Sequence, residues 1–382
     1  MNDITLCHDS VGLYVHVPFC QAKCRYCAFY SEPLGLHNPQ PLVDALCMEL
    51  RQYSPDLAQV STVYLGGGSP TGLPSHLLGQ LLAEISTHCQ ALEEFTVECN
   101  PGQTTPKLLE LMQSRQVNRL SFGVQSWDDS ELTLLGRNHS ADQARQAIKA
   151  AQCSGFGNIG VDLIFAIPGS THDTWRNTLA QTLTLGIQHI STYSLSYEVG
   201  TPLSRARKAG HLQAVDEALD RDMYETAIDV LPAAGYPQYE ISNFARPDSA
   251  CRHNLGYWHN HPFIGIGPSA ASYWLGCRRT NIASVTDYVA QIQSSHPLQC
   301  ETAYPDKPEH TCETAVLGLR MLGGLHARDF YRLTGKDLWE TFGAVITEHE
   351  QMGHLHVSPD QIALTRAALP IADRVLCDFA AL

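Results

Sequence analysis

Apolar and polar residues follow two alternating patterns along the first half of the chain. Short β-branched or apolar runs end at a Gly, Pro or polar break, and each is followed by a stretch with apolar residues at helical spacing. Strands that alternate with helices of this length are typical of parallel βαβ units. Six units predict an α/β fold, a partial (β/α)6 barrel, with a doubly wound sheet as the alternative because sequence does not fix strand order. The expected strands are 13–17, 62–65, 94–98, 119–123, 160–165 and 189–194, and the expected helices lie near 41–53, 75–89, 106–115, 140–153 and 171–185.

The pattern changes after residue 200, which indicates further regions. Residues 203–231 are charged and have helical spacing, and a stretch crowded with Pro, Gly, His and aromatic residues follows Pro232. The last 70 residues predict two helices and then a hairpin, with strands at 355–357 and 361–365. We therefore expect a barrel over 1–235, a loop-rich region that closes it over 236–300, and a C-terminal α+β, winged-helix-like domain over 301–382.

Charge and cysteine usage narrow the class of protein. With 39 acidic and 25 basic residues the formal charge is −14, which argues against a partner held through phosphate neutralisation, as nucleic acids are. No charged and apolar leader and no run of 18 apolar residues is present, so we expect a soluble, cytoplasmic protein. The odd total of 13 cysteines does not indicate a disulfide framework, and isolated ones such as Cys47, Cys89, Cys153 and Cys377 are expected to be buried.

Three cysteines are clustered in the segment YVHVPFCQAKCRYCAFY, at Cys20, Cys24 and Cys27. Three thiolates are one ligand short of a closed tetrahedral site. One interpretation adds His16 to give a three-cysteine, one-histidine zinc site, although His16 lies inside the predicted strand. The other is a [4Fe-4S] cluster whose open iron chelates the amino and carboxylate groups of an amino acid, as in S-adenosylmethionine.

Glycines and polar residues follow the predicted strands at the positions where parallel sheets bind ligands. Gly66, Gly67 and Gly68 come directly after the second strand and allow a ligand to approach the backbone closely. Asp162 lies inside an apolar run and needs a partner, because burying an unpaired carboxylate is costly. The other polar candidates at these strand ends and in the following loops are Glu98, Gln125 and Arg137.

These motifs resemble the radical S-adenosylmethionine superfamily. The resemblance rests on CxxxCxxC after YxHxPF, on GGG[ST]P after the second strand, and on the four polar residues at these positions. It implies that Cys20, Cys24 and Cys27 ligate a [4Fe-4S] cluster. It further implies an S-adenosylmethionine site lined by Tyr14, Tyr26, Gly67, Gly68, Ser69, Glu98, Gln125, Arg137, Asp162 and Ser196.

Within that superfamily the chain resembles the HemN/HemW branch, which contains the oxygen-independent coproporphyrinogen III oxidase and the heme chaperones. The oxidase carries a further cysteine two residues after the third, where this chain has Phe29. The segments YEISNFARP and HNxxYW, the second of which spans 253–258, resemble the heme chaperones. The candidate heme-binding residues are therefore His253, Asn254, Tyr257 and Trp258.

A tetrapyrrole suits this segment chemically. Neutral imidazole is a common axial ligand of heme iron, aromatic rings pack on a flat macrocycle, and Arg246 and Arg252 are available for propionates. The alternative is that these histidines and aromatic residues only cover the mouth of the barrel.

The resemblance implies a chaperone that binds heme and delivers it to an acceptor heme protein. The implied acceptors are respiratory heme proteins, among them membrane-associated ones. The alternative function is the oxidase reaction, which is the oxidative decarboxylation of porphyrinogen propionates. A flavodoxin- or ferredoxin-like reductant and a homodimer are compatible with the resemblance, and whether S-adenosylmethionine is cleaved stays open.

Overall fold

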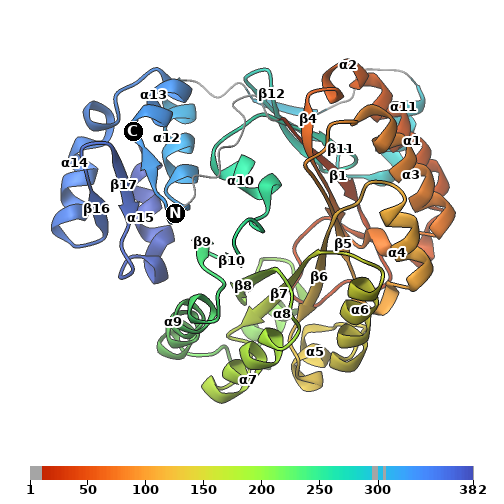
Figure 1. The fold of residues 1–382 in the computed structure, drawn as a ribbon, viewed down its shortest axis with the longest axis horizontal. Coiled ribbons are helices and arrows are strands. Elements are labelled where there is room, and N and C mark those ends of the chain that lie inside the picture. The colour runs from red at the N-terminus through yellow and green to blue at the C-terminus, as the bar shows by residue number, and fades with distance from the viewer. Residues whose placement is uncertain (1–10, 295–299, 304–306, 382) are drawn as a thin grey trace.

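The computed structural model describes residues 11–294, 300–303 and 307–381, and its centre is a curved parallel sheet (Figure 1). The six predicted strands are confirmed and lie side by side in chain order, all parallel. The doubly wound alternative is wrong, because that arrangement requires the strand order to reverse. The six strands are β1 (Val11–Val17), β4 (Val60–Gly67), β5 (Glu94–Cys99), β6 (Arg119–Gln125), β7 (Asn158–Phe165) and β8 (His189–Ser194).

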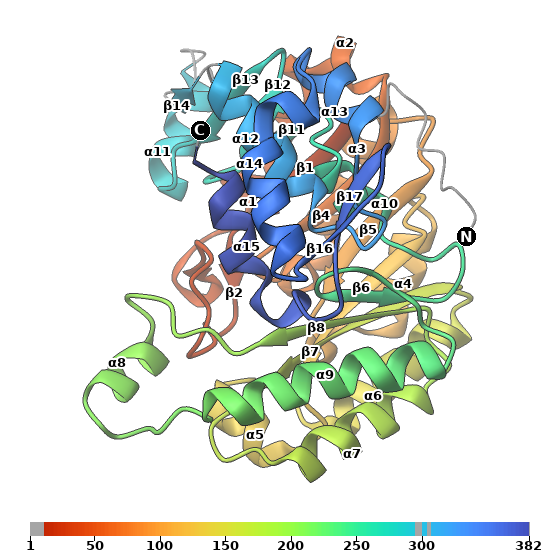
Figure 2. The ribbon, with the colours of Figure 1, turned by 90° about the vertical axis from the view of Figure 1, so that its left-hand side faces the viewer.

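Helices cover the outer side of this sheet (Figures 1 and 2). The five predicted helices are confirmed as α1 (Gln40–Gln52), α3 (Ser75–His88), α4 (Pro106–Gln113), α6 (Ala141–Cys153) and α7 (His172–Leu183). The charged stretch after residue 200 forms two helices rather than one, α8 (Pro202–Lys208) and α9 (Glu217–Ala233), because Asp216 caps the start of the second. Two short helices complete this part, α2 (Ser54–Leu57) and α5 (Asp129–Leu135).

The two faces of the sheet differ in polarity. Leu13, Val15, Val63 and Leu65 face the helices and are fully buried, so the apolar core lies between the sheet and the outer helices. On the barrel strands the alternate residues point to the inner side, and many of these are polar, such as Glu98 on β5. A parallel sheet covered on both faces is normally apolar on both. The polar inner face therefore marks the interior of the partial barrel as a candidate site.

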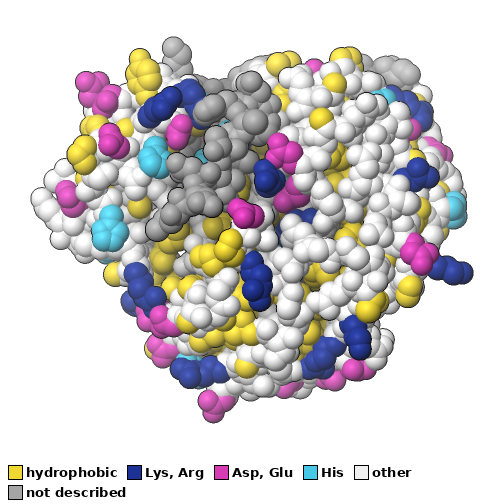
Figure 3. Space-filling model, in the orientation of Figure 1, with side chains coloured by type: hydrophobic (Ala, Val, Ile, Leu, Met, Phe, Trp, Pro, Cys, Tyr) yellow, Lys and Arg dark blue, Asp and Glu magenta, His cyan; other side chains and the backbone are white. Residues whose placement is uncertain are grey.

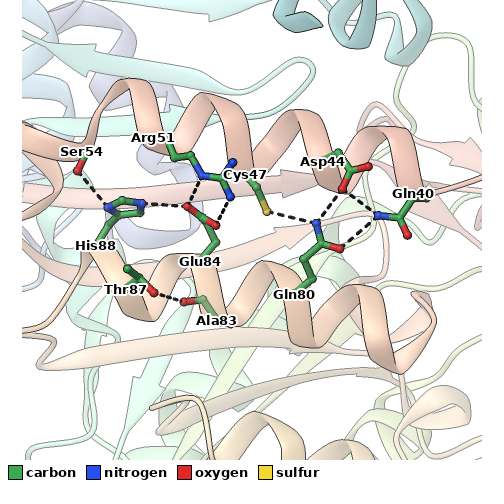
Figure 4. Close-up of polar contacts among 10 residues, drawn as sticks. All are labelled: Gln40, Asp44, Cys47, Arg51, Ser54, Gln80, Ala83, Glu84, Thr87 and His88. Atoms are coloured by element: carbon green, nitrogen blue, oxygen red, sulfur yellow. Dashed lines mark hydrogen bonds and ion pairs between the residues drawn. The ribbon is translucent and has the colours of Figure 1, made fainter.

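Polar contacts fasten α1 to α3 along the outer surface (Figure 4). Arg51 donates two hydrogen bonds to the Glu84 carboxylate, at 2.8 and 2.7 Å, and the adjacent His88 contacts the same carboxylate at 3.0 Å. The Arg51 side chain is 60% exposed, so the pair is screened by solvent and contributes little to stability. Its role is to orient two helices that apolar packing already holds.

The sheet extends beyond the barrel at both edges. Beside β1 lies a parallel strand, β11 (Phe263–Ile266), followed by antiparallel β12 (Ala271–Trp274), β13 (Cys277–Asn281) and β14 (Cys300–Ala303). Beside β8 lie β10 (Asn243–Ala245) and β9 (Gln238–Glu240). Residues 236–300, expected to be rich in loops, thus form several strands together with α10 (Arg252–Trp258) and α11 (Val285–Gln293). These strands are short and become regular because they pair with the edges of the barrel.

The C-terminal part is a small α+β module on the open side of the barrel (Figure 1). The predicted hairpin is confirmed as β16 (Leu355–Val357) and β17 (Gln361–Leu364), and β15 (Leu325–His326) pairs with it. Phe330, Phe342 and Phe379 form its core, with ring centroids 5.9 and 5.2 Å apart. The three predicted domain boundaries stay predictions. The helices of the module are α12 (Lys307–Gly318), α13 (Ala327–Thr334), α14 (Leu338–Gln351) and α15 (Ala372–Phe379).

The isolated cysteines only partly follow the prediction. Cys47 and Cys89 are buried, whereas Cys153 and Cys377 are exposed because each lies on the solvent side of an amphipathic helix. Each cysteine whose side chain the structure describes is a free thiol. None of the helices in those ranges has the length and apolar character needed to cross a bilayer.

Candidate functional site

The cysteine triad, Cys20, Cys24 and Cys27, lies just beyond the carboxyl end of β1: Cys20 ends the two-residue strand β2 (Phe19–Cys20), and Cys24 and Cys27 lie in the cysteine loop that follows it. The three side chains are partly exposed free thiols. Burial raises the pKa of the Cys20 and Cys27 thiols, and neighbouring thiolates raise it further. Thiols with a raised pKa ionise more easily when a metal supplies the opposing positive charge.

A buried guanidinium reaches this loop from the other side of the barrel. Arg137 follows Gly136, whose left-handed backbone conformation ends α5. Its Nη1 donates to the Cys24 sulfur at 3.2 Å, and its Nη2 donates to the carbonyl of Gly123. Arg137 therefore links the cysteine loop to the end of β6.

His16 does not turn toward the cysteines. Its Nδ1 lies 2.8 Å from the Tyr14 hydroxyl and its Nε2 lies 3.1 Å from the carbonyl of Tyr30, so both ring nitrogens have other partners. Among the described residues, no group of three or more His, Cys, Asp and Glu side chains has the spacing for a single metal ion. This arrangement does not fit the mononuclear zinc interpretation. Three thiols on one partly exposed loop fit the larger cubane cluster, which needs no fourth protein ligand when a small molecule occupies the open iron.

The three glycines after β4 are required by close contacts. A Cβ atom on Gly66 would lie 2.8 Å from the carboxyl carbon of Glu98, and one on Gly68 would lie 2.6 Å from the carbonyl oxygen of Phe19. Gly67 has φ +109°, and its Cβ would lie 2.6 Å from the ring of His16. The glycines bring the end of β4 against the cysteine loop. The neighbouring Ser69 is buried, and its hydroxyl donates to Gln103.

Two hydrogen bonds fix the carboxylate of Glu98 on this inner surface. It accepts a hydrogen bond from the Tyr64 hydroxyl at 3.0 Å and one from the backbone N–H of Gly67 at 3.1 Å. Burial and the nearby Asp162 raise the pKa of Glu98 to about 7, against the two hydrogen bonds. The pKa of Asp162 is also raised by burial, while Ser191 and Arg119 oppose the shift.

Gln125 and Arg137 converge at Gly123. A Cβ on Gly123 would lie 3.0 Å from Nε2 of Gln125 and 3.2 Å from Nη2 of Arg137. Gln125 ends β6 rather than following it, and its φ of 72° is unusual for a residue other than glycine. Such strain concentrates at functional positions. Tyr26 is half-buried next to Arg137; burial raises the pKa of the Tyr26 hydroxyl, and the Arg137 guanidinium opposes this shift. Ser196 is exposed in the loop after β8.

The HNxxYW segment forms α10, which sequence reasoning missed. Its composition is unfavourable for a helix, and Cys251 provides no side-chain cap. Instead, the Glu94 carboxylate at the start of β5 accepts the N–H groups of Arg252 and His253, at 3.0 and 3.1 Å. A carboxylate at a helix N-terminus satisfies free donors and complements the helix dipole. The start of α10 is therefore stabilised by Glu94, which lies 158 positions before Arg252 in the sequence.

His253 is enclosed at the amino end of the barrel strands. Only 2% of it is exposed; its Nδ1 lies 3.0 Å from the Thr62 hydroxyl and its Nε2 lies 2.8 Å from the Tyr257 hydroxyl. Burial lowers its pKa to about 3, so the imidazole is neutral at physiological pH. Because Thr62 lies near the start of β4 and the cysteine loop follows the far end of β1, the two candidate sites lie toward opposite ends of the barrel.

Trp258, another heme candidate, contacts the C-terminal part of the chain. The guanidinium of Arg320 lies over the Trp258 ring at 4.5 Å, and the indole Nε1 is buried without a hydrogen-bond partner. Asn254 is half-buried on the same helix. Arg246 and Arg252, expected to bind propionates, are engaged with Tyr236 and Glu93 respectively.

Comparison with known proteins identifies the family. A family model of the radical SAM superfamily matches residues 14–181, and one of the HemN C-terminal domain matches residues 306–371. The heme chaperone HemW of Lactococcus lactis is 31% identical over 96% of both chains. That of Bacillus subtilis is 32% identical over 96% of this chain and 98% of its own. The chain belongs to the HemW family of radical SAM proteins.

A solved structure supports the fold of this HemW family member. The coproporphyrinogen III oxidase HemN from Escherichia coli superposes with a TM-score of 0.84, over 98% of this chain and 90% of its own, at 20% identity. At that identity the likeness concerns the fold alone. The radical SAM family implies a [4Fe-4S] cluster and S-adenosylmethionine as cofactors, and the cysteine triad and the glycines after β4 fit both.

Three residues of this interior were missed from sequence: Glu94, Tyr64 and Arg119. Each lies on a predicted strand, and its inward direction was the available signal. Their partners come from distant segments, which a single sequence does not reveal.

Proposed function

We propose that this HemW family member is a heme chaperone, which binds heme at α10 and transfers it to an acceptor heme protein. The observation that carries the proposal is its similarity, over nearly the whole chain, to relatives named heme chaperone HemW. Phe29 in place of the oxidase cysteine and the HNxxYW segment support the same choice.

The cofactor residues divide into two groups in this proposal. The cysteine triad would hold the cluster, and Glu98, Gln125, Arg137 and Asp162 would bind S-adenosylmethionine together with the glycines after β4. When bound, the cluster and S-adenosylmethionine supply a reducing centre beside a sulfonium group. Arg137 steadies Cys24 while it borders the cofactor site, and Glu98 offers a fixed acceptor for hydroxyl groups.

Heme binding by His253 requires local movement of α10. The cleft that reaches the ring has a volume of only about 10 Å³, roughly the room for one water molecule, and is lined by Gly12, Arg252, Gly256 and Tyr257, among others. Ligand pockets generally measure roughly 300–1,000 Å³. Freeing one ring nitrogen breaks a hydrogen bond worth about 0.5–1.5 kcal/mol, a modest cost beside an iron–imidazole bond. The depressed pKa helps, since no proton competes with iron.

Heme titration of the purified protein tests the proposal. We expect a stoichiometric complex with an imidazole-ligated spectrum that His253→Ala abolishes. His259→Ala is the matched control, because His259 directly follows α10 and its ring stacks on His261 instead. An unchanged spectrum in His253→Ala would remove this histidine as the ligand, and absence of any heme complex would refute the chaperone function.

Transfer and catalysis need separate assays. Mixing the heme-loaded protein with an apo-form heme protein is expected to move the heme spectrum to the acceptor. In an anaerobic assay with coproporphyrinogen III and a reductant, we expect no decarboxylated product. Catalytic product formation would establish the oxidase instead. A homodimer and a flavodoxin- or ferredoxin-like reductant stay predictions.

A further inference from the structure

Tyr64 belongs to neither sequence motif, yet it contacts the central residue of both sites. It lies on the inner face of β4, two residues after Thr62 and two before Gly66. Its hydroxyl donates to Oε1 of Glu98 at 3.0 Å. Oε2 of the same carboxylate accepts the N–H of Gly67 at 3.1 Å. Because one donor holds each oxygen, the orientation of the Glu98 carboxylate depends on Tyr64.

The ring of Tyr64 packs against α10. Its centroid lies 5.4 Å from that of His253, with the two planes at 30°. His253 is held there by Thr62 from the same strand and by Tyr257 from its own helix. Gly12 leaves room for the imidazole, because a Cβ at that position would lie 3.1 Å from its Cε1. The space is closely filled, so His253 cannot turn toward a ligand without changing what Tyr64 packs against.

We propose that Tyr64 is a positioning residue of the S-adenosylmethionine site and couples that site to α10, so that heme and S-adenosylmethionine weaken each other's binding. The inference rests on the proposed function, which places heme at His253 and S-adenosylmethionine at Glu98. When His253 leaves its two hydrogen bonds, the ring of Tyr64 loses its support and its hydroxyl no longer holds the carboxylate. By linkage, S-adenosylmethionine disfavours the displaced His253 by the same factor.

Binding of S-adenosylmethionine to the cluster-reconstituted full chain, under anaerobic conditions, measures this coupling. In the unmodified protein we expect saturating heme to weaken the affinity at least about 5-fold. Tyr64→Phe keeps the ring and removes the hydroxyl, so we expect about 10-fold weaker binding without heme and no further effect of heme. Tyr236→Phe is the matched control, because the Tyr236 hydroxyl is buried and donates to the carbonyl of Ile187, away from both sites. It is expected to behave like the unmodified protein.

The pH profile of binding separates positioning from a general structural role. The ionisable groups that face Glu98 are Asp162, Arg119, Tyr14 and Tyr64. Tyr64 donates to the ionised carboxylate and so lowers the pKa of Glu98; removing the donor raises this pKa. The pH midpoint of S-adenosylmethionine binding should therefore move upward in Tyr64→Phe and stay in place in Tyr236→Phe.

The outcomes distinguish the inference from the proposed function. If the protein binds no heme, the chaperone function fails, while the affinity and pH midpoint of Tyr64→Phe still decide the positioning role. If heme binds but leaves the affinity for S-adenosylmethionine unchanged or strengthens it, the coupling is refuted and the chaperone function stands. If Tyr64→Phe binds S-adenosylmethionine like the unmodified protein with the same pH midpoint, the positioning role is refuted.

Discussion

Glu94 allows a demanding test of how the HNxxYW helix is built. Its side chain is buried at the start of β5, and its two oxygens accept the N–H groups of Arg252 and His253. Glu94→Gln keeps the shape and replaces one oxygen with an amide NH2 group. That group would face a backbone donor, so one hydrogen bond of the cap is lost and a second is weakened.

The expected loss of stability follows from these contacts. A hydrogen bond to a charged acceptor contributes about 1.5–3 kcal/mol. The change also removes a carboxylate near Arg119, which is 2% exposed, and leaving a buried cation without its counter-charge costs several kcal/mol. Since the barrel retains other carboxylates close to Arg119, we expect unfolding to become easier by about 3 kcal/mol.

Urea unfolding and hydrogen exchange measure this effect at two levels. In Glu94→Gln the amides of Arg252 and His253 should exchange faster than in the unmodified protein. This increase should be larger than that of the amides in the neighbouring strands. Glu93→Gln is the matched control: Glu93 pairs with the Arg252 side chain at the surface, where it is 44% exposed, so we expect a change below about 1 kcal/mol. Equal losses in the two variants, or unchanged exchange at the start of α10 in Glu94→Gln, would refute the capping role.

Three further predictions concern other parts of the chain. Burial raises the pKa of Glu49 to about 7, above its unfolded value. Its contribution to stability is therefore full below about pH 4.5 and is lost as the pH rises through 7. Between these two pH values, Glu49→Gln should change the slope of the unfolding free energy against pH by the equivalent of about one proton. Gly67→Ala should destabilise the protein by several kcal/mol more than Gly169→Ala, because both have positive φ but only Gly67 meets the ring of His16; thermal unfolding of the two variants compares them. Cys24→Ser should abolish cluster assembly, measured as iron and sulfide content, while heme binding is partly retained; simultaneous loss of both would contradict the separation of the two sites.

The sequence by itself determined the barrel and its cysteine loop. Each of the six predicted strands and five predicted helices of the first half has a local signal, a period of two or of 3.6 and a Gly or Pro break, so no distant contact is needed to predict it. The triad of cysteines and the glycines after β4 are equally local. Their physical requirements, a thiolate cluster ligand and a close backbone approach, are written in residue type and spacing.

The tertiary structure decided how the second half completes the barrel. Helix α10 has weak intrinsic helix propensity and exists because Glu94 caps it, and β11 became a strand because β1 supplies its hydrogen bonds. The roles of Tyr64 and His253 also depend on contacts between segments about 190 residues apart, as the hydrogen bond of Thr62 with His253 shows. Local composition cannot report such pairs, because their energy arises only when the folded sheet brings its strands and this helix together.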